Sequence, residues 1–343
     1  MADRDRDPLG LLPRVAERRV TGNADLDAEL RAAGEPFIVR GLAADWPLVQ
    51  AGLRSAREAR DYLAERAVDR PFVASVGAKG SEGRFFYNEA MAMNFRMATA
   101  KLPDIFAQME AGEQGGDAQP IYLASIDVNT FFKGLHEANH VDLGDRSCLA
   151  SIWIGTPTRI AAHNDFPQNL ACVAAGRRRF TLFPPDQFRN LYLGPVDHTP
   201  AGRAVSMVDF HAPDPGRHPR FPEALRHAQV ADLAPGDALF IPSMWWHHVE
   251  GLDPFNVLVN YWWRDTPRWL GQPQDALNHA MMAIRDLPAT EKQHWRDLFN
   301  WYVFDNEKEV VDHIPPQARS ILAPLTAESA GRIRAFLLKA LSR

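Results

Sequence analysis

Between residues 148 and 263, short runs of β-prone residues follow one another with turn residues between them. Gly176, the Pro184–Pro185 pair and the Pro235-Gly236-Asp237 turn separate several of these runs. This rhythm is typical of an all-β barrel or jelly roll, here with a long insert near residues 186–226. Several runs are too apolar to alternate cleanly, as expected of strands that are covered on both faces. The predicted strands span residues 148–154, 169–174, 178–183, 229–233, 238–241 and 256–263.

The segments on either side of this β-rich region contain helical patterns. Apolar residues three and four positions apart predict C-terminal helices at 274–285, 289–302 and 327–341. The N-terminal side is mixed, with helices expected at 26–33, 54–67 and 91–110, a glycine-rich loop at 112–116, and strands at 35–40, 71–76 and 121–125. The predicted fold class is therefore mainly β with flanking helices. We expect one domain over residues 1–270, with a mixed flank (1–120) and a β core (about 121–265), and a helical region over 271–343.

Charge and cysteine content limit the expected partners and compartment. The 343-residue chain has a net charge of −5, so bulk attraction to nucleic acid or to an anionic membrane is not expected. No stretch approaches roughly 18 uninterrupted apolar residues, and the charged N-terminus does not look like a signal peptide. The two cysteines, Cys148 and Cys172, favour a reducing compartment. The sequence thus predicts a cytoplasmic protein with no membrane and no nucleic-acid partner.

A His-x-Asp pair, His163 and Asp165, lies between two of the predicted strands. Side chains alternate along a strand, so this pair projects to one side at a strand end and Asn164 points away. A third ligand must then return from a distant strand. The segment Trp245-Trp-His-His248 supplies two histidines, His247 lying 82 positions after Asp165. Adjacent strand residues face opposite ways, so only one of His247 and His248 can join the pair.

Two histidines and one carboxylate form the facial triad that holds iron(II) and leaves three coordination positions open. In a wide β barrel this donor set favours iron and O₂ chemistry. Zinc and manganese also accept nitrogen and oxygen ligands, so the residues alone leave these metals open.

Several strings of residues, in the same order, carry a resemblance to a known family. Those strings are Pro36-Phe-Ile-Val-Arg-Gly41 with Trp46-Pro47, His163-Asn-Asp-Phe-Pro-Gln-Asn169, Arg179-Phe-Thr-Leu-Phe-Pro-Pro-Asp-Gln-Phe188, Gly236-Asp-Ala-Leu-Phe-Ile-Pro242, Trp245-Trp-His-His248 and Val259-Asn-Tyr-Trp262. With them, most of residues 35–265 resembles the cupin-like JmjC family of iron(II)- and 2-oxoglutarate-dependent oxygenases. The chain looks most like the branch that contains the asparaginyl hydroxylase inhibiting the hypoxia-inducible factor. The resemblance implies a double-stranded β-helix, or jelly-roll, core.

The resemblance also implies roles for individual residues. His163, Asp165 and His247 match the family's iron ligands, which selects His247 over His248. Arg178, 13 positions after Asp165, matches the basic residue that binds the distal carboxylate of 2-oxoglutarate. Further matches near the iron and the cosubstrate are Tyr122, Asn169, Asn260 and Trp262.

The chain departs from the family's pattern at two positions. Arg178 stands where close relatives usually have lysine, and a planar guanidinium has a different reach from an ammonium group. It can still pair with a carboxylate through two parallel hydrogen bonds. Ile160 stands where the family has a threonine, so one hydrogen bond to the cosubstrate is expected to be missing.

The family's activity implies iron(II), 2-oxoglutarate and O₂ as cofactors and cosubstrates, with hydroxylation of a C–H bond. We expect a protein or peptide side chain as the substrate. A small-molecule metabolite and a noncatalytic cupin-like binding module are the alternatives, whereas histone demethylation is disfavoured by the lack of a chromatin-reading domain or basic tail. Because relatives dimerise through a C-terminal helical pair, we also expect a homodimer. The C-terminal region carries suitable aromatic residues, Trp295, Phe299, Trp301 and Tyr302.

Overall fold

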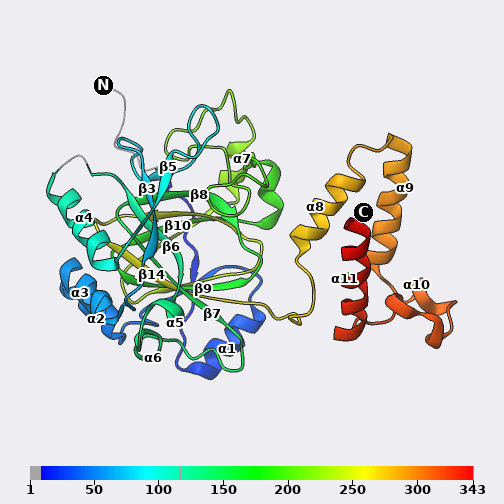
Figure 1. Cartoon of the computed structure of the whole chain (residues 1–343), viewed down its shortest axis with the longest axis horizontal. Helices are drawn as coiled ribbons and strands as arrows, with labels where there is room; N and C mark the ends of the chain where they lie inside the picture. The colour runs from blue at the N-terminus through cyan, green and yellow to red at the C-terminus, as the bar shows by residue number, and fades with distance from the viewer. Residues whose placement is uncertain (1–8, 116–117, 343) are drawn as a thin grey trace. The chain divides into compact units, whose positions relative to one another are not determined.

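The computed structural model of the chain describes residues 9–115 and 118–342 (Figure 1). Contacts between residues divide the chain into two compact units, one ending at Arg264 and the other beginning at Asp265. Each unit is described by itself below.

The first unit is built on two β-sheets. Within the described residues, the larger sheet has nine strands in the order β1-β2-β12-β9-β14-β7-β6-β3-β5, and the smaller has five in the order β11-β10-β13-β8-β4. The strands of the larger sheet are β1 (Ala16–Glu17), β2 (Phe37–Val39), β12 (Ala238–Ile241), β9 (Gln168–Ala175), β14 (Asn256–Trp263), β7 (Leu149–Gly155), β6 (Ile121–Asp127), β3 (Phe72–Gly77) and β5 (Phe95–Ala100). Those of the smaller sheet are β11 (Gln229–Leu233), β10 (Arg178–Phe183), β13 (Trp246–Gly251), β8 (Thr158–Asn164) and β4 (Arg84–Phe85).

Both faces of the larger sheet are covered, which explains why its central strands do not alternate. Val173 and Leu258 of this sheet share one apolar cluster with Phe180 and Val249 of the smaller sheet. On the other face, Cys172 of β9 and Val257 of β14 join a second cluster that includes residues of the helices. The two packed sheets confirm the predicted mainly β fold with a double-stranded β-helix core and a helical C-terminal region.

Helices that precede β7 in the chain supply the cover of the larger sheet. They are α1 (Asn23–Ala32), α2 (Pro47–Arg54), α3 (Ala56–Arg66), α4 (Leu102–Gly115), α5 (Val128–Phe131) and α6 (Leu135–Ala138). Pro47 starts α2, where a missing N–H costs nothing, and Leu48 and Val49 are buried. Ser55 then caps α3, because its hydroxyl accepts a hydrogen bond from the Glu58 backbone.

The predicted helix at 91–110 is wrong in its first half. Residues 95–100 form β5, which pairs antiparallel with β3 from Phe72↔Ala100 to Gly77↔Phe95. This long-range pairing outweighs a local helical pattern, as tertiary context often does. The helix begins only at Leu102 and continues through Gly112 to Gly115, where a loop was expected. Gly116, the last residue of that expected loop, lies outside the described residues.

The insert after β10 leads from one strand of the smaller sheet to the next. It contains a 3₁₀ turn (Pro185–Arg189) and α7 (Phe221–Arg226). Between them, a bridge pairs Leu193 with Ser206 antiparallel, and a Met207 N–H donates to the Tyr192 carbonyl at 2.9 Å. The segment 191–207 therefore folds back on itself as a hairpin, which we call the insert hairpin.

The second unit is helical. It contains α8 (Pro273–Ala283), α9 (Ala289–Phe299) with a π-helical extension (Asn300–Asp305), α10 (Glu309–Asp312), two 3₁₀ turns (Pro316–Ala318 and Ser320–Leu322) and α11 (Ala327–Leu341). A capping box between Thr326 and Ser329 fixes the start of α11. Among the helices in the described part of the chain, none is long and apolar enough to cross a membrane.

Candidate metal centre

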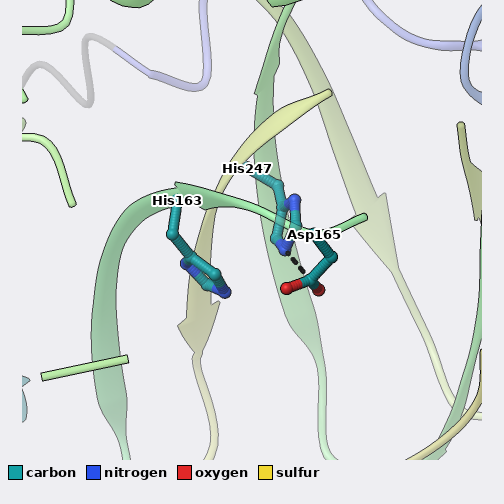
Figure 2. Close-up of side chains that lie close together, drawn as sticks. All are labelled: His163, Asp165 and His247. Carbon is teal, nitrogen blue, oxygen red and sulfur yellow. Dashed lines mark ion pairs between the residues drawn. The ribbon is translucent and has the colours of Figure 1, made fainter. Parts of the chain in front are cut away.

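Three predicted ligands meet at the end of two neighbouring strands (Figure 2). His163 lies near the end of β8, Asp165 follows the strand, and His247 lies on β13. The antiparallel register places His247 directly opposite His163. One ligand atom from each of the three side chains lies within 4.8 Å of the others, and the Nε2 of His247 is 3.6 Å from a carboxylate oxygen of Asp165.

Backbone carbonyls fix the orientation and tautomer of both imidazoles. The Nδ1 of His163 is 2.9 Å from the carbonyl of Ala161, and the Nδ1 of His247 is 3.1 Å from that of Trp245. A carbonyl can only accept a hydrogen bond, so each Nδ1 carries the proton. Each Nε2 then keeps its lone pair, which is the state of a metal-binding histidine.

Burial keeps His247 neutral. Desolvation, together with a smaller effect of the neighbouring His163, lowers the pKa of His247 to about 4, although Asp165 acts in the opposite direction. The imidazole is therefore neutral at neutral pH, with a free lone pair on Nε2, as a metal ligand must be.

His248 faces the opposite side of β13. It stands opposite Thr181 of β10, its ring centroid is 4.8 Å from that of Phe210, and its Nδ1 is 3.7 Å from Glu250. The choice of His247 as the ligand thus agrees with the strand alternation, because His248 packs against the insert.

All eight site residues predicted from the sequence line one cavity of about 560 Å³ between the two sheets. Apolar side chains from both sheets and residues 199–202 of the insert hairpin also line the cavity. The predicted residues are Tyr122, His163, Asp165, Asn169, Arg178, His247, Asn260 and Trp262.

Arg178 is buried in this cavity together with Tyr122. The Arg178 side chain is 1% exposed, and its Nη2 lies 3.5 Å from the Trp153 carbonyl. Burial raises the pKa of Tyr122 to about 12, although the nearby, hydrogen-bonded Arg178 lowers it. Leu182 is the register partner of His247, and Arg178 lies four residues earlier on the same strand, about 13 Å along it.

A chain of hydrogen bonds connects Asn260 and Asn169 to Trp153. The Trp153 indole N–H donates to the Asn260 side-chain oxygen at 2.7 Å, and the Asn260 amide donates to Asn169 at 3.0 Å. Trp153 also stacks with Tyr122 and meets Trp262 edge-on, at centroid distances of 6.0 and 5.7 Å. Trp153 therefore contacts three of the predicted residues directly, Tyr122, Asn260 and Trp262.

The sequence did not single out Trp153 or Arg203. Trp153 lies within a predicted strand, where a tryptophan reads as ordinary core. Arg203, in the insert, donates to both the carbonyl and the side-chain oxygen of Asn164, at 3.2 and 3.1 Å. Burial lowers the pKa of Arg203, and the nearby Asp165 raises it. No local sequence pattern in the insert predicts the contact between Arg203 and Asn164.

The residues of the cavity fit a metal ion together with a carboxylate ligand. Two nitrogens and one carboxylate oxygen converge, which is the donor set of an iron(II) site with open positions. Among the described residues, the buried Nε of Arg178 and Nε1 of Trp262 have no hydrogen-bond partner. Buried donors are normally satisfied, so these two remain for a ligand with acceptor oxygens.

Comparisons with known proteins agree with this geometry. A family model described as a cupin-like domain matches residues 23–268. tRNA wybutosine-synthesizing protein 5 of Danio rerio is 29% identical over 278 residues, which cover 76% of this chain and 77% of that protein. HSPB1-associated protein 1 of Rattus norvegicus is 32% identical over 150 residues (42% of this chain, 30% of that protein). Lysine-specific demethylase JMJ31 of Arabidopsis thaliana is 35% identical over 123 residues (35% and 22%). The chain thus spans less than a third of the length of these last two relatives.

Proposed function

The chain belongs to the cupin-like domain family, and we propose from that premise that it is an iron(II)- and 2-oxoglutarate-dependent dioxygenase. It hydroxylates a C–H bond, most favourably on a protein or peptide side chain. One observation carries the proposal: the three converging donors and the buried Arg178 line the same cavity.

His163 and His247 would hold iron(II) through Nε2, and Asp165 through a carboxylate oxygen. The carbonyls of Ala161 and Trp245 orient the two rings before a metal arrives, so little rearrangement is needed on binding. Three coordination positions stay open.

Arg178 and Tyr122 would bind the distal carboxylate of 2-oxoglutarate. A guanidinium can donate two parallel hydrogen bonds to a carboxylate. In the family that this chain resembles, a lysine and a threonine would together donate hydrogen bonds to the cosubstrate. Here Arg178 would donate them alone, and Ile160 forms part of the apolar wall of the cavity. The two departures from the family's pattern thus compensate for each other.

When bound, iron(II) and 2-oxoglutarate supply the redox chemistry: O₂ gives one oxygen atom to the substrate C–H bond and one to the succinate that remains after CO₂ is lost. The chain's own residues position the reactants and exclude water. Phe180, Val249 and Leu258 provide apolar walls around the buried polar groups.

The cavity favours an uncharged target group. Apart from histidines, the charged side chains among its described lining residues are Asp165 and Arg178, and both already have roles. A methylated ammonium group would thus find no additional carboxylate. This supports hydroxylation of an uncharged side chain over demethylation.

Conversion of 2-oxoglutarate to succinate tests the proposal directly. Purified protein with iron(II), ascorbate and air should form succinate, followed by NMR, even without a prime substrate. Asp165→Ala should abolish the conversion, and Asp186→Ala, which removes an exposed carboxylate in the insert, should leave it intact. Absence of succinate formation by the wild-type protein would contradict the proposal.

A further inference from the structure

A second hollow lies on the insert and has a volume of about 840 Å³. It shares no lining residue with the metal-centre cavity, and no Asp or Glu is among its described lining residues. We call it the insert groove; it is lined by Phe188, Arg189, Tyr192, Leu193, Met207, Arg217, His218 and Arg220.

The three arginines of the insert groove carry uncompensated positive charge. Arg189, Arg217 and Arg220 are exposed, and none forms an ion pair with a carboxylate in the described part of the chain. The Arg220 guanidinium donates to the Arg189 carbonyl at 2.9 Å, which holds it in place without neutralising it. Elsewhere exposed arginines are commonly paired, as Arg177 is with Asp253. Three unpaired guanidinium groups around one groove in a chain of net charge −5 therefore form a local basic patch.

Aromatic rings lie beside two of these guanidinium groups. Phe188 is 45% exposed, and the Arg189 guanidinium carbon lies 5.5 Å from its ring centroid. The Arg220 guanidinium carbon is 4.4 Å from the Tyr192 centroid, and the His218 ring meets Tyr192 edge-on at 4.9 Å. The groove thus combines cations with flat rings.

We propose that the insert groove binds single-stranded nucleic acid. A single strand alternates negative phosphates with flat bases, so guanidinium groups can pair with the phosphates while the rings stack on the bases. An acidic peptide would match the charge but not the rings. The net charge of −5 led us to expect no nucleic-acid partner. The proposal differs from that expectation because a local basic patch, rather than the net charge, determines whether phosphates can bind. It stands apart from the oxygenase proposal, since no residue of the metal centre takes part.

The insert hairpin connects the groove to the metal-centre cavity. Leu193 lines the groove, and Thr199 to Gly202 line the cavity. Leu193 and Thr199 are six residues apart, so the chain between them spans at most roughly 21 Å. A strand held in the groove would lie within a few nucleotides of the cavity.

Fluorescence anisotropy with a labelled mixed-sequence 12-nucleotide RNA tests the proposal on the full chain. We expect saturable binding whose affinity falls with salt. The triple variant Arg189→Gln/Arg217→Gln/Arg220→Gln should bind at least tenfold more weakly. The slope of log affinity against log salt should become shallower by about 2, since each phosphate contact on a single strand contributes about 0.7. Phe188→Ala should weaken binding about 5- to 150-fold while leaving that slope unchanged.

A charge-matched control separates the groove from general electrostatics. Arg54→Gln/Arg57→Gln/Arg285→Gln removes the same charge from exposed positions elsewhere and should retain wild-type affinity. A single variant, Arg217→Glu, tests the groove independently in case the triple variant does not fold. The exposed guanidinium of Arg217 has no hydrogen bond within the described residues, so its loss should not disturb the fold, and binding should again weaken more than tenfold. Three results would overturn the proposal: no RNA binding at low salt, equal losses in the two triple variants, or tighter binding of an acidic peptide of equal charge.

Discussion

Arg178 combines deep burial with a guanidinium that forms no ion pair with a carboxylate within the described residues. Burial lowers its pKa, and its contact with Tyr122 raises it. An unpaired buried charge destabilises a fold unless something compensates for it. A bound dicarboxylate would supply the missing negative charge. The proposed role of Arg178 thus explains how the fold tolerates its buried charge.

Replacing Arg178 by glutamine should weaken 2-oxoglutarate binding. Hydrogen bonds to charged groups contribute about 1.5–3 kcal/mol, so we expect the Kd measured by anaerobic calorimetry to rise about 10- to 150-fold. The adjacent Arg177 is exposed and paired with Asp253, so Arg177→Gln is the matched control and should leave the Kd unchanged. Equal affinity of the Arg178 variant and the wild type would remove this residue from the cosubstrate site.

Much of the site could be predicted from the sequence because its residues lie on short strands bounded by turn residues. Strand alternation and the family resemblance together identified eight residues, and all eight line one cavity. Trp153 and Arg203 were missed for physical reasons. A tryptophan within a predicted strand is indistinguishable from an ordinary core residue, and Arg203 lies in an irregular insert whose sequence has no hydrophobic periodicity. The departures at Arg178 and Ile160 were visible in the sequence, but only the shared cavity suggests that they compensate for each other.

At the level of elements, strand β13 separates two histidines by the alternation of its side chains. His247 faces the cavity, and His248 faces Phe210 and Glu250. Burial is the largest cause that lowers the pKa of each to about 4. Both rings are therefore neutral in the folded protein at pH 6, whereas both would be mostly protonated in the unfolded chain at that pH.

The metal-free protein should lose stability between pH 6.5 and pH 4. A histidine whose folded pKa is depressed contributes stability above its unfolded pKa, and this contribution is lost as the pH falls towards the folded pKa. The loss is on the order of 3 kcal/mol for each histidine. Urea unfolding at several pH values measures it, and His248→Leu should flatten the dependence. Carboxylates with lowered pKa values titrate mainly below this window. An unfolding free energy that stays constant from pH 6.5 to 4 would contradict the prediction.

The turn between β9 and β10 depends on Gly176. Its φ is +67°, and a Cβ there would lie 2.5 Å from the Phe255 carbonyl oxygen. Gly176→Ala should therefore destabilise the first unit by more than the roughly 1–2 kcal/mol of a left-handed conformation alone. Gly34→Ala, where a Cβ meets nothing within 4 Å, is the control. Chemical denaturation should show a clear loss only for the first variant.

Element prediction succeeded where turns bound a compact apolar run, and failed where a distant partner decides the structure. Strands β10, β11, β12 and β14 have the predicted ends. By contrast, α2 was not among the predicted helices, and β5 exists because β3 pairs with it. That pairing joins segments about 20 residues apart, so it is not visible within a short window of sequence.

At the scale of the whole molecule, the predicted membership of the cupin-like JmjC family is confirmed, whereas the assembly and the cytoplasmic location stay predictions. The second unit exposes large apolar side chains that a solvated appendage does not need. Among them, Phe304 is 72% exposed and Phe336 71%. Such surfaces usually mark interfaces.

We therefore expect a homodimer through the helical unit. Light scattering after size exclusion should give about twice the chain mass of 38.5 kDa. Phe304→Glu/Phe336→Glu should give the monomer mass, while Leu11→Glu, an exposed apolar residue of the first unit, should not. A wild-type protein of single-chain mass at micromolar concentration would contradict the expectation.

The central claim is that His163, Asp165 and His247 hold iron(II) that 2-oxoglutarate then chelates. Anaerobic titration with both should produce the metal-to-ligand charge-transfer band in the visible spectrum. We predict the band in the wild type and in His248→Ala, which changes the neighbouring residue on the other face of β13, and its loss in His247→Ala. A wild-type protein without the band, or a band that survives in His247→Ala, would contradict the account.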